Sequence, residues 1–206
     1  MGISGFEIGS HIGEKSLSDK DFDPLYKVCE DLNVALFIHP WDMHMWDGRL
    51  QKYWMPWLVG MPSETAQAIV SVLMGGVLER FPKLRLCFAH GGGSYPQIRA
   101  RCGHGYRVRP DLCAMDSTLA PDHQDKLIWA DSLVHDPNAL QLLLSFLPKD
   151  QVCLGTDYPF PLGELEVGKV IEDSPFLSDT DRDTLLWGSA VKLFNLDENK
   201  LSNKPF

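Results

Sequence analysis

The sequence is poor in positive charge. It carries 19 Lys and Arg residues against 28 Asp and Glu residues, which gives a formal net charge of -9 at pH 7. Nucleic acids and anionic membrane surfaces are bound through clustered positive charge. The charge balance therefore argues against a nucleic-acid or membrane partner, and it is compatible with a small-molecule site that is only locally positive.

Long apolar runs and paired cysteines are also missing. The longest apolar stretch, AIVSVLMGGVL (68–78), is too short to cross a bilayer, and the first residues lack the basic start and apolar core of a signal peptide. The five cysteines are odd in number and include no C-x-x-C pair. We therefore expect reduced thiols and a protein of the cytosol.

Three common catalytic motifs are absent or incomplete. The segment HGGG (90–93) has neither the lysine of a phosphate-binding P-loop nor the spacing of a dinucleotide-binding loop. It is similar to the oxyanion segment of lipases, but the chain contains no G-x-S-x-G nucleophile turn. The simpler interpretation is that these glycines allow a close approach of backbone beside a site.

Five short apolar runs are predicted to be strands: 5–9, 35–39, 84–90, 126–131 and 152–157. They are nearly continuous rather than alternating, which is typical of parallel strands covered on both faces. Helical patterns lie between them: 23–32, 64–80 with Ser63 as its cap, a helix opened by Asp136 and Pro137, 179–186 and 190–194. The alternation predicts a single α/β domain over residues 1–206.

The number of strand–helix units leaves two architectures open. Five units in 206 residues give about 41 residues each, and eight such units would need about 330, within the range of a (β/α)8 barrel. The chain begins almost directly on a strand. The sequence therefore predicts either an open parallel sheet or a barrel that lacks three units at its N-terminus.

Polar side chains recur where the predicted strands end. His39, His90 and Asp157 each close one of these runs, and Asp131 closes another. In a parallel barrel these strand ends converge on one mouth, and imidazole and carboxylate groups are good zinc ligands. The three residues His39, His90 and Asp157 thus predict a metal site, unless each of them only caps its own strand or turn.

Aromatic residues crowd into one segment, which contains Tyr53, Met43, Met45, Met55 and four tryptophans, at positions 41, 46, 54 and 57. Such a segment can line a pocket for a flat unsaturated substrate, or it can form a hydrophobic lid or a dimer contact. Four arginines follow the glycines, at positions 99, 101, 107 and 109. One of them can clamp a carboxylate, although a solvated helix face is the better interpretation for most.

Five blocks of sequence carry a resemblance to a known family: HPWDM (39–43), YWMPWLVGMP (53–62), MGGVLERFPKLRLCFAHGGG (74–93), RPDLCA (109–114) and LGTDYPFPLGELEVGK (154–169). At these blocks the chain closely resembles the 2-amino-3-carboxymuconate-6-semialdehyde decarboxylases of the metal-dependent amidohydrolase superfamily. The resemblance extends over essentially all 206 residues. It implies an amidohydrolase-type (β/α)8 barrel, a Zn²⁺ cofactor and a cytosolic homodimer.

The family's reaction is the non-oxidative decarboxylation of an unsaturated dicarboxylate semialdehyde in the kynurenine route of tryptophan breakdown, which diverts it from quinolinate and NAD synthesis. Carried over by position, the resemblance implies that His39 and Asp157 are zinc ligands. It implies that His90 is the catalytic acid and base, assisted by Asp157 in orienting an activated water.

The remaining site residues also come from the resemblance alone. Trp57 is implied as a substrate contact and Phe160 as a pocket wall. Arg101 is implied as the arginine that reaches the partner subunit's site and grips a substrate carboxylate.

One departure from the family pattern limits these implications. Family members begin with a strand that ends in His-x-His, which supplies two zinc ligands, and this chain contains no His-x-His. The family's second substrate-binding arginine also has no counterpart. The chain therefore resembles barrel units four to eight, and we expect it to bind zinc weakly by itself and to be nearly inactive.

Two alternatives stay open. The chain can be a non-catalytic truncated subunit that dimerises with the full-length enzyme and down-regulates it, which requires the segment around Arg101 to keep its dimer contacts. It can also catalyse another decarboxylation or a hydrolysis within the superfamily, but the tryptophan-rich segment argues against this, because its resemblance is to the decarboxylases named above.

Overall fold

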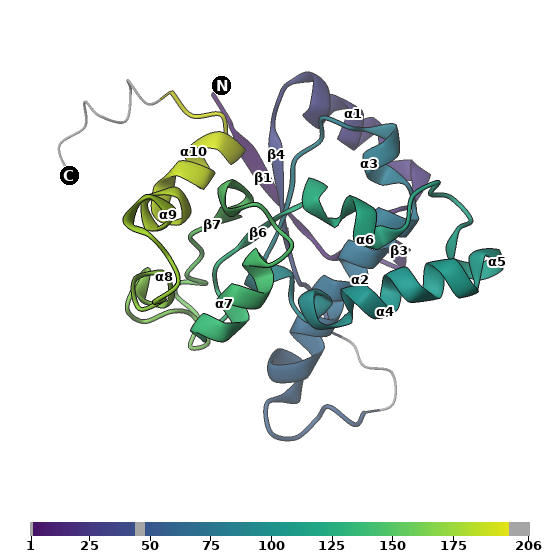
Figure 1. Cartoon of the computed structure of the whole chain (residues 1–206). Coiled ribbons are helices and arrows are strands. Elements are labelled where there is room, and N and C mark those ends of the chain that lie inside the picture. The colour runs from purple at the N-terminus through teal and green to yellow at the C-terminus, as the bar shows by residue number, and fades with distance from the viewer. Residues whose placement is uncertain (1, 44–47, 198–206) are drawn as a thin grey trace.

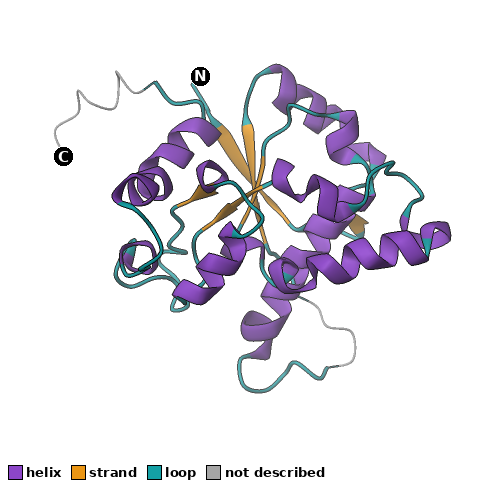
Figure 2. Cartoon of the chain, viewed as in Figure 1, coloured by secondary structure: helices purple, strands orange, loops and turns teal. Residues whose placement is uncertain are grey.

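A parallel sheet forms the centre of the molecule in the computed structural model, which describes residues 2–43 and 48–197. Its strands are β1 (Gly5–Gly9), β4 (Ala35–His39), β5 (Leu86–Phe88), β6 (Trp129–Asp131) and β7 (Val152–Cys153), each parallel to its neighbours. A short antiparallel pair, β2 (His11–Ile12) and β3 (Lys15–Ser16), lies outside this sheet. Figures 1 and 2 show helices on both sides of the central strands.

The strand order is the order of the chain, β1-β4-β5-β6-β7. An open doubly wound sheet reverses direction at a switch point, whereas the strands of a (β/α) barrel follow one another in sequence. The order observed here is therefore that of consecutive barrel units. The prediction of a barrel-type sheet is confirmed over an arc of five strands.

The longer helices connect these strands. They are α1 (Asp23–Asp31), α2 (Met61–Met74), α4 (Tyr95–Val108) and α7 (Pro137–Leu144). Shorter helices are α3 (Val77–Arg80), α5 (Pro110–Cys113), α6 (Pro121–Gln124), α8 (Lys169–Glu172), α9 (Asp179–Asp183) and α10 (Ser189–Leu193). Single turns occupy Lys20–Phe22, Pro56–Gly60, His90–Gly92, Asp125–Leu127, Lys149–Gln151 and Thr184–Gly188. Within the described residues, none of these helices is both long and apolar enough to cross a membrane.

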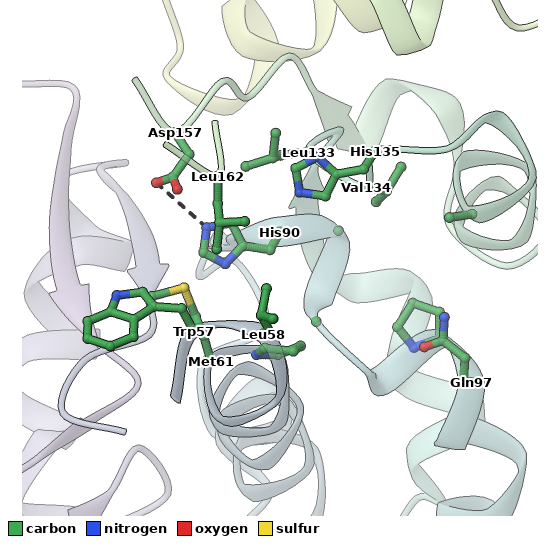
Figure 3. A pocket seen from close by; sticks show the side chains of 15 residues that line it. Trp57, Leu58, Met61, His90, Gln97, Leu133, Val134, His135, Asp157 and Leu162 are labelled. Carbon is green, nitrogen blue, oxygen red and sulfur yellow. Dashed lines mark ion pairs between the residues drawn. The ribbon is translucent and has the colours of Figure 1, made fainter. Parts of the chain in front are cut away.

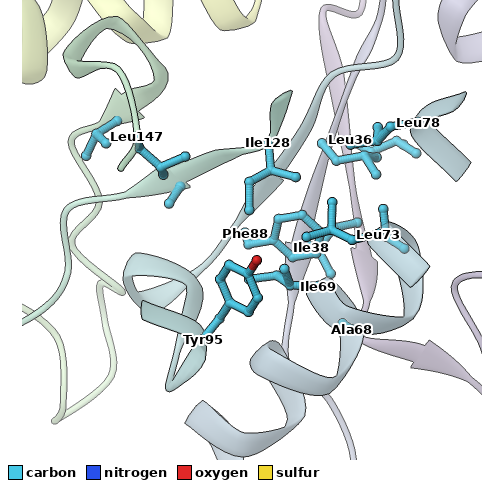
Figure 4. Close-up of a cluster of buried hydrophobic side chains, with 14 of the residues drawn as sticks. Leu36, Ile38, Ala68, Ile69, Leu73, Leu78, Phe88, Tyr95, Ile128 and Leu147 are labelled. Carbon is cyan, nitrogen blue, oxygen red and sulfur yellow. The ribbon is translucent and has the colours of Figure 1, made fainter. Parts of the chain in front are cut away.

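Successive side chains of each strand point to opposite faces of the sheet. One face, which we call the helix face, carries Leu36, Ile38, Leu86, Phe88, Ala130 and Val152 and packs against α2 and its neighbours in the main core (Figure 4). Each fully buried aliphatic or aromatic side chain of this kind contributes about 1.5–3 kcal/mol. The large helix-face core therefore supplies most of the driving force for folding.

The opposite face, which we call the site face, carries Ala35, Phe37, His39, Cys87, Trp129, Asp131 and Cys153. Its apolar part is small and is covered by Leu193, the last residue of α10, and by Phe194, which follows the helix. Gly5 is needed here, because a Cβ at this position would lie 2.6 Å from a ring carbon of Phe194. The five cysteines are all free in this structure.

Helix starts agree only partly with the sequence-based prediction. Asp136 caps α7 as predicted, accepting hydrogen bonds from the backbone amides of Asn138 and Ala139. The prediction of one helix over 64–80 capped by Ser63 is wrong, since Ser63 lies inside α2 and donates to the Val59 carbonyl at 2.7 Å. Gly75 and Gly76 then separate α2 from α3, and Gly76 has φ 64°, which favours glycine.

Candidate active site

Three strand ends bring His39, His90 and Asp157 together. His39 is the last residue of β4, His90 begins the turn after β5, and Asp157 follows β7. The Asp157 Oδ1 atom lies 3.3 Å from His39 Nε2 and 3.7 Å from His90 Nε2. The two imidazole rings stand edge to face, with centroids 5.0 Å apart. Residues separated by more than 100 positions in the sequence thus form one cluster.

Local backbone conformation presents two of these side chains to the cluster. His90 has φ 56° and Asp157 has φ 53°, so both non-glycine residues occupy the left-handed region. This conformation is unfavourable for residues with a side chain, and it tends to persist where the surrounding structure enforces it, commonly at functional sites. Gly91, Gly92 and Gly93 continue the same left-handed path after His90, which explains the three glycines of the sequence.

The cluster is half-buried. The exposed fractions of the side chains are 22% for His39, 14% for His90 and 11% for Asp157. Burial lowers the pKa of the His90 imidazole below its ordinary value, although the nearby Asp131 and Asp157 carboxylates oppose this shift. His90 is therefore neutral near pH 7, with a lone pair free for a metal ion or a proton.

The geometry fits a divalent metal ion. One ligand atom from each of the three residues lies within 4.8 Å of the others, and the described part of the chain contains no second group of this kind. Zinc bonds of about 2.0–2.2 Å in a tetrahedron place neighbouring ligand atoms about 3.3–3.6 Å apart. The separations of 3.3 and 3.7 Å from Asp157 Oδ1 are close to that spacing, so these side chains could hold zinc or a similar ion.

Two cavities open beside the cluster and share Trp57, Met61, Asp157 and Leu162. The first, of about 240 Å³, reaches past His90 toward Gln97 and His135, as Figure 3 shows. The second, of about 450 Å³, is lined by His39 and by apolar side chains that include Trp41, Trp54 and Phe160. Apolar walls around a few polar groups are typical of small-molecule sites.

The aromatic segment of the sequence reaches these cavities. Trp57 lies in the π-helical turn Pro56–Gly60 and lines both, with its ring 5.9 Å from that of Trp54. Phe160 lines the second cavity, at the position predicted to be a pocket wall. Met45 and Trp46, also part of this segment in the sequence, lie outside the described residues.

Arg101 does not lie at the cluster. It is exposed on α4, lines none of the cavities beside the site, and makes no hydrogen bond or ion pair within the described residues. The other three arginines of this segment form ion pairs inside the chain: Arg99 with Asp125, Arg107 with Asp122 and Arg109 with Asp111. Among these four, Arg101 alone keeps its guanidinium available for another molecule.

Asp131 is a residue to which the sequence assigned no role. It ends β6 on the site face, is 5% exposed, and lines a third cavity of about 260 Å³ with His39, His90 and Asp157. Burial raises the pKa of its carboxyl group. The sequence does indicate that Asp131 lies at the end of a strand. Its role could not be predicted from this position, because its contacts depend on two other strands.

Comparison with known proteins identifies the relatives of this chain. It is 59% identical to the 2-amino-3-carboxymuconate-6-semialdehyde decarboxylase of Caenorhabditis elegans, over 100% of this chain and 59% of that protein. The enzyme of the same name from Dictyostelium discoideum is 48% identical over 97% of this chain and 55% of its own length. The chain therefore spans a little more than half the length of these relatives.

Solved structures share the fold. The 5-carboxyvanillate decarboxylase LigW of Sphingomonas paucimobilis superposes with a TM-score of 0.83 at 22% identity, covering 94% of this chain and 59% of that one. A second 5-carboxyvanillate decarboxylase, from Novosphingobium aromaticivorans, was crystallised with bound manganese and superposes with a TM-score of 0.80 at 20% identity, covering 95% and 58%. At these identities the likeness concerns the fold alone.

The family model described as Amidohydrolase matches residues 1–196. This match includes all five strands of the sheet and the three residues of the cluster. It agrees with the barrel-type strand order and with the resemblance found in the sequence. The chain belongs to the amidohydrolase family.

Proposed function

We propose that this chain carries the catalytic half of a metal-dependent decarboxylase that acts on 2-amino-3-carboxymuconate 6-semialdehyde in tryptophan breakdown. The supporting observation is the cluster of His39, His90 and Asp157, which lies beside an apolar cavity lined by Trp57. Decarboxylases that bear that name are 59% and 48% identical to the chain. Zn²⁺ is the proposed cofactor, and manganese is the competing ion.

The proposed mechanism assigns each residue one task. His39 and Asp157 would hold the ion, which supplies positive charge that polarises the substrate and its water. Loss of the carboxylate as CO₂ leaves an electron pair on the substrate carbon, and this carbon then takes up a proton. His90 could take this proton from water at Nε2 and pass it to the carbon, because burial keeps its imidazole neutral and able to accept a proton beforehand.

The walls of the cavity would bind the substrate. Trp57 presents an aromatic ring between the two cavities, and Phe160 closes one side of the larger cavity. A conjugated, nearly planar substrate can stack on such rings, and water is displaced from the reacting carbon. A cavity of about 450 Å³ is large enough for a molecule of this size.

Arg101 is proposed to act on another copy of the protein. It is exposed and, within the described residues, has neither a hydrogen bond nor an ion pair, whereas its three neighbours of the same type are neutralised within the chain. In a cytosolic homodimer its guanidinium could grip a substrate carboxylate in the partner's site with two parallel hydrogen bonds. The same free arginine supports the second candidate function, in which the chain pairs with a longer enzyme and reduces its activity.

The metal site is proposed to be weak in this chain by itself. Two protein ligands, His39 and Asp157, make a poor zinc site, and using His90 as a third ligand would remove the proton carrier. We therefore expect the purified chain to bind zinc substoichiometrically and to show only trace decarboxylation. One tightly bound zinc ion together with full activity would contradict this expectation.

The following experiment tests the proposed function independently of the weak metal site of the isolated chain. The chain is combined with a second polypeptide that corresponds to the part of the C. elegans relative it does not match, and CO₂ release and bound metal are measured. Decarboxylation should appear in the mixture and be lost with His90→Gln or Asp157→Asn. His104→Gln is the control, because His104 is exposed on α4 away from the cavities.

Three outcomes decide between the candidates. Activity in the mixture that survives both His90→Gln and Asp157→Asn would exclude the proposed mechanism. No decarboxylation in any mixture in which both polypeptides co-elute would exclude the proposed function for this chain. Inhibition of the full-length C. elegans relative by the added chain, abolished by Arg101→Ala, would favour the second candidate.

A further inference from the structure

A buried carboxylate adjoins the candidate site without belonging to the metal-binding cluster. Asp131 ends β6, with its side chain on the same face of the sheet as His39, and it is 5% exposed. It forms no ion pair with a Lys or Arg side chain within the described residues, and its acceptor capacity is directed to backbone amides. A buried acid of this kind needs an explanation, because burial of an unpaired charge is costly.

The hydrogen bonds of Asp131 fix the peptide unit that follows His90. The backbone amide of Gly91 donates to Asp131 Oδ1 at 2.9 Å, and the carbonyl of His90 in the same peptide unit accepts from the Gly93 amide at 2.8 Å. The peptide plane is thus held at both ends. Because this plane sets the ψ angle of His90, it also limits where the imidazole can point.

The same oxygen ties this turn to the next loop. Leu133 donates its backbone amide to Asp131 Oδ1 at 3.0 Å, and the following residue, Val134, lies against the turn. A Cβ on Gly91 would be 2.3 Å from a methyl carbon of Val134, so the two segments are in close contact. The turn at His90 therefore packs against the loop that is hydrogen-bonded to Asp131.

Backbone strain at His90 makes such an anchor necessary. His90 has φ 56° and precedes three glycines with φ 60°, 77° and 61°. A run of left-handed residues is not maintained by local preferences, since only glycine adopts this conformation readily. Without the hydrogen bond from Gly91 to Asp131, unstrained backbone conformations of His90 would compete with the observed one.

The carboxylate also contacts the segment that carries Asp157. A Cβ on Gly155 would lie 2.6 to 2.8 Å from the side-chain atoms of Asp131, so only glycine leaves room for the carboxylate there. The Gly155 amide donates to the hydroxyl of Ser132 at 3.3 Å. Asp131 and its neighbour Ser132 thereby hold the ends of both β5 and β7 against β6.

We propose that Asp131 is a positioning residue, which holds His90 in a single orientation facing Asp157 by fixing the peptide unit between His90 and Gly91. It acts through backbone hydrogen bonds and contacts neither substrate nor metal. Its consequence for decarboxylation rests on the proposed function, whereas its effect on His90 does not. Mutation of groups that orient metal-site side chains in this way typically lowers metal affinity or activity by about 10- to 100-fold.

The experiment measures the His90 side chain directly. In the ¹³C- and ¹⁵N-labelled full chain, the three-bond couplings from His90 Cγ to its backbone nitrogen and carbonyl carbon report the χ1 rotamer. The wild type and Asp131→Asn should each show one rotamer, because an asparagine Oδ1 can still accept both amides. Asp131→Ala should show averaged couplings, with hydrogen exchange at Gly91 and Leu133 faster by about 10-fold.

Asp125→Ala is the matched control. Asp125 is also a buried aspartate, 3% exposed, but it pairs with Arg99 and lies away from the site. This variant should lose stability without changing the His90 couplings. If Asp131→Ala does not fold, Asp131→Ser keeps one short acceptor and should show partial averaging.

The outcomes distinguish this proposal from the proposed function. A single His90 rotamer in Asp131→Ala or Asp131→Ser, or equal averaging in Asp125→Ala, overturns the positioning role. In the two-polypeptide assay, decarboxylation should fall in Asp131→Ala and be spared in Asp131→Asn. If no mixture decarboxylates, the wild type included, the function fails while the coupling result still decides the role of Asp131.

Discussion

The two faces of the sheet differ in what they bury. The helix face carries aliphatic and aromatic side chains that enter the main core, whereas the site face carries a small apolar cluster below His39 and Asp131. Ile38 and His39 are neighbours in β4 and point to opposite faces. The comparison indicates that one face supplies most of the apolar core and the other carries the candidate site, although both belong to the same five strands.

The largest expected effect concerns the helix face. Ile38 is fully buried in the main core, so Ile38→Ala should lower the free energy of unfolding by about 2–5 kcal/mol. Metal binding by the molecules that remain folded should not change, because His39 keeps its place. Urea unfolding and metal titration check the two statements, and a loss of metal affinity at full stability would contradict the division between the faces.

The complementary change tests the site face. His39→Gln should lower affinity for Zn²⁺ by at least about 10-fold, since even the loss of an outer contact to a metal ligand has effects of this size. Stability without metal should stay within about 1 kcal/mol of the wild type, because His39 is partly exposed and belongs to neither hydrophobic cluster. Calorimetric titration and urea unfolding of the same preparations measure both; a variant that unfolds like Ile38→Ala would show that the site face is also structural.

Two glycines allow the cost of backbone strain to be measured separately from the cost of steric crowding beside the site. Gly91 and Gly13 both have φ 60°, but a Cβ on Gly91 would meet Val134 at 2.3 Å, whereas nothing lies within 4 Å of a Cβ on Gly13. Gly13→Ala should cost about 1 kcal/mol for the left-handed conformation alone. Gly91→Ala should cost about 1–3 kcal/mol more, because the side chain overpacks the loop beneath His90. Equal losses of stability in the two variants, measured by thermal unfolding, would mean that the loop accommodates the added methyl group at no cost in stability.

The sequence predicted the helix face and the strand ends better than the contacts between them. Apolar runs such as ALFIH locate the strands, because burial on both faces leaves few alternatives, and the polar residues that follow locate His39, His90 and Asp157. Strands β5, β6 and β7 are shorter than their apolar runs. Strands β5 and β7 end before His90 and Asp157, whereas β6 begins later than predicted and ends on Asp131 itself. Convergence of strand ends is a general property of parallel barrels, so this much could be predicted.

The missed features depend on partners that are distant in sequence. Asp131 gains its importance from the amide of Gly91 and from the absence of a side chain at Gly155, and neither follows from the strand pattern. The pairing of Arg99 with Asp125 likewise required α4 to pack beside α6 and the turn after it. Such contacts are set by tertiary packing, whereas local propensity decides only which elements form.

The smallest expected effect lies away from both faces, at the start of α9. Hydrogen bonds from Lys149 and from Ser178 lower the pKa of Asp181 from 3.8 to about 2. A carboxylate with a depressed pKa stabilises the folded state above its unfolded pKa, and this contribution is lost as the pH falls through about 2. Asp181→Asn should therefore be less stable than the wild type at pH 5, and the gap should close between about pH 4 and pH 2. Urea unfolding across this range measures the gap, with Asp179→Asn, fully exposed in the same helix, as the control. A gap that stays constant down to pH 2 would mean that the Lys149 contact adds nothing to the stability of the fold.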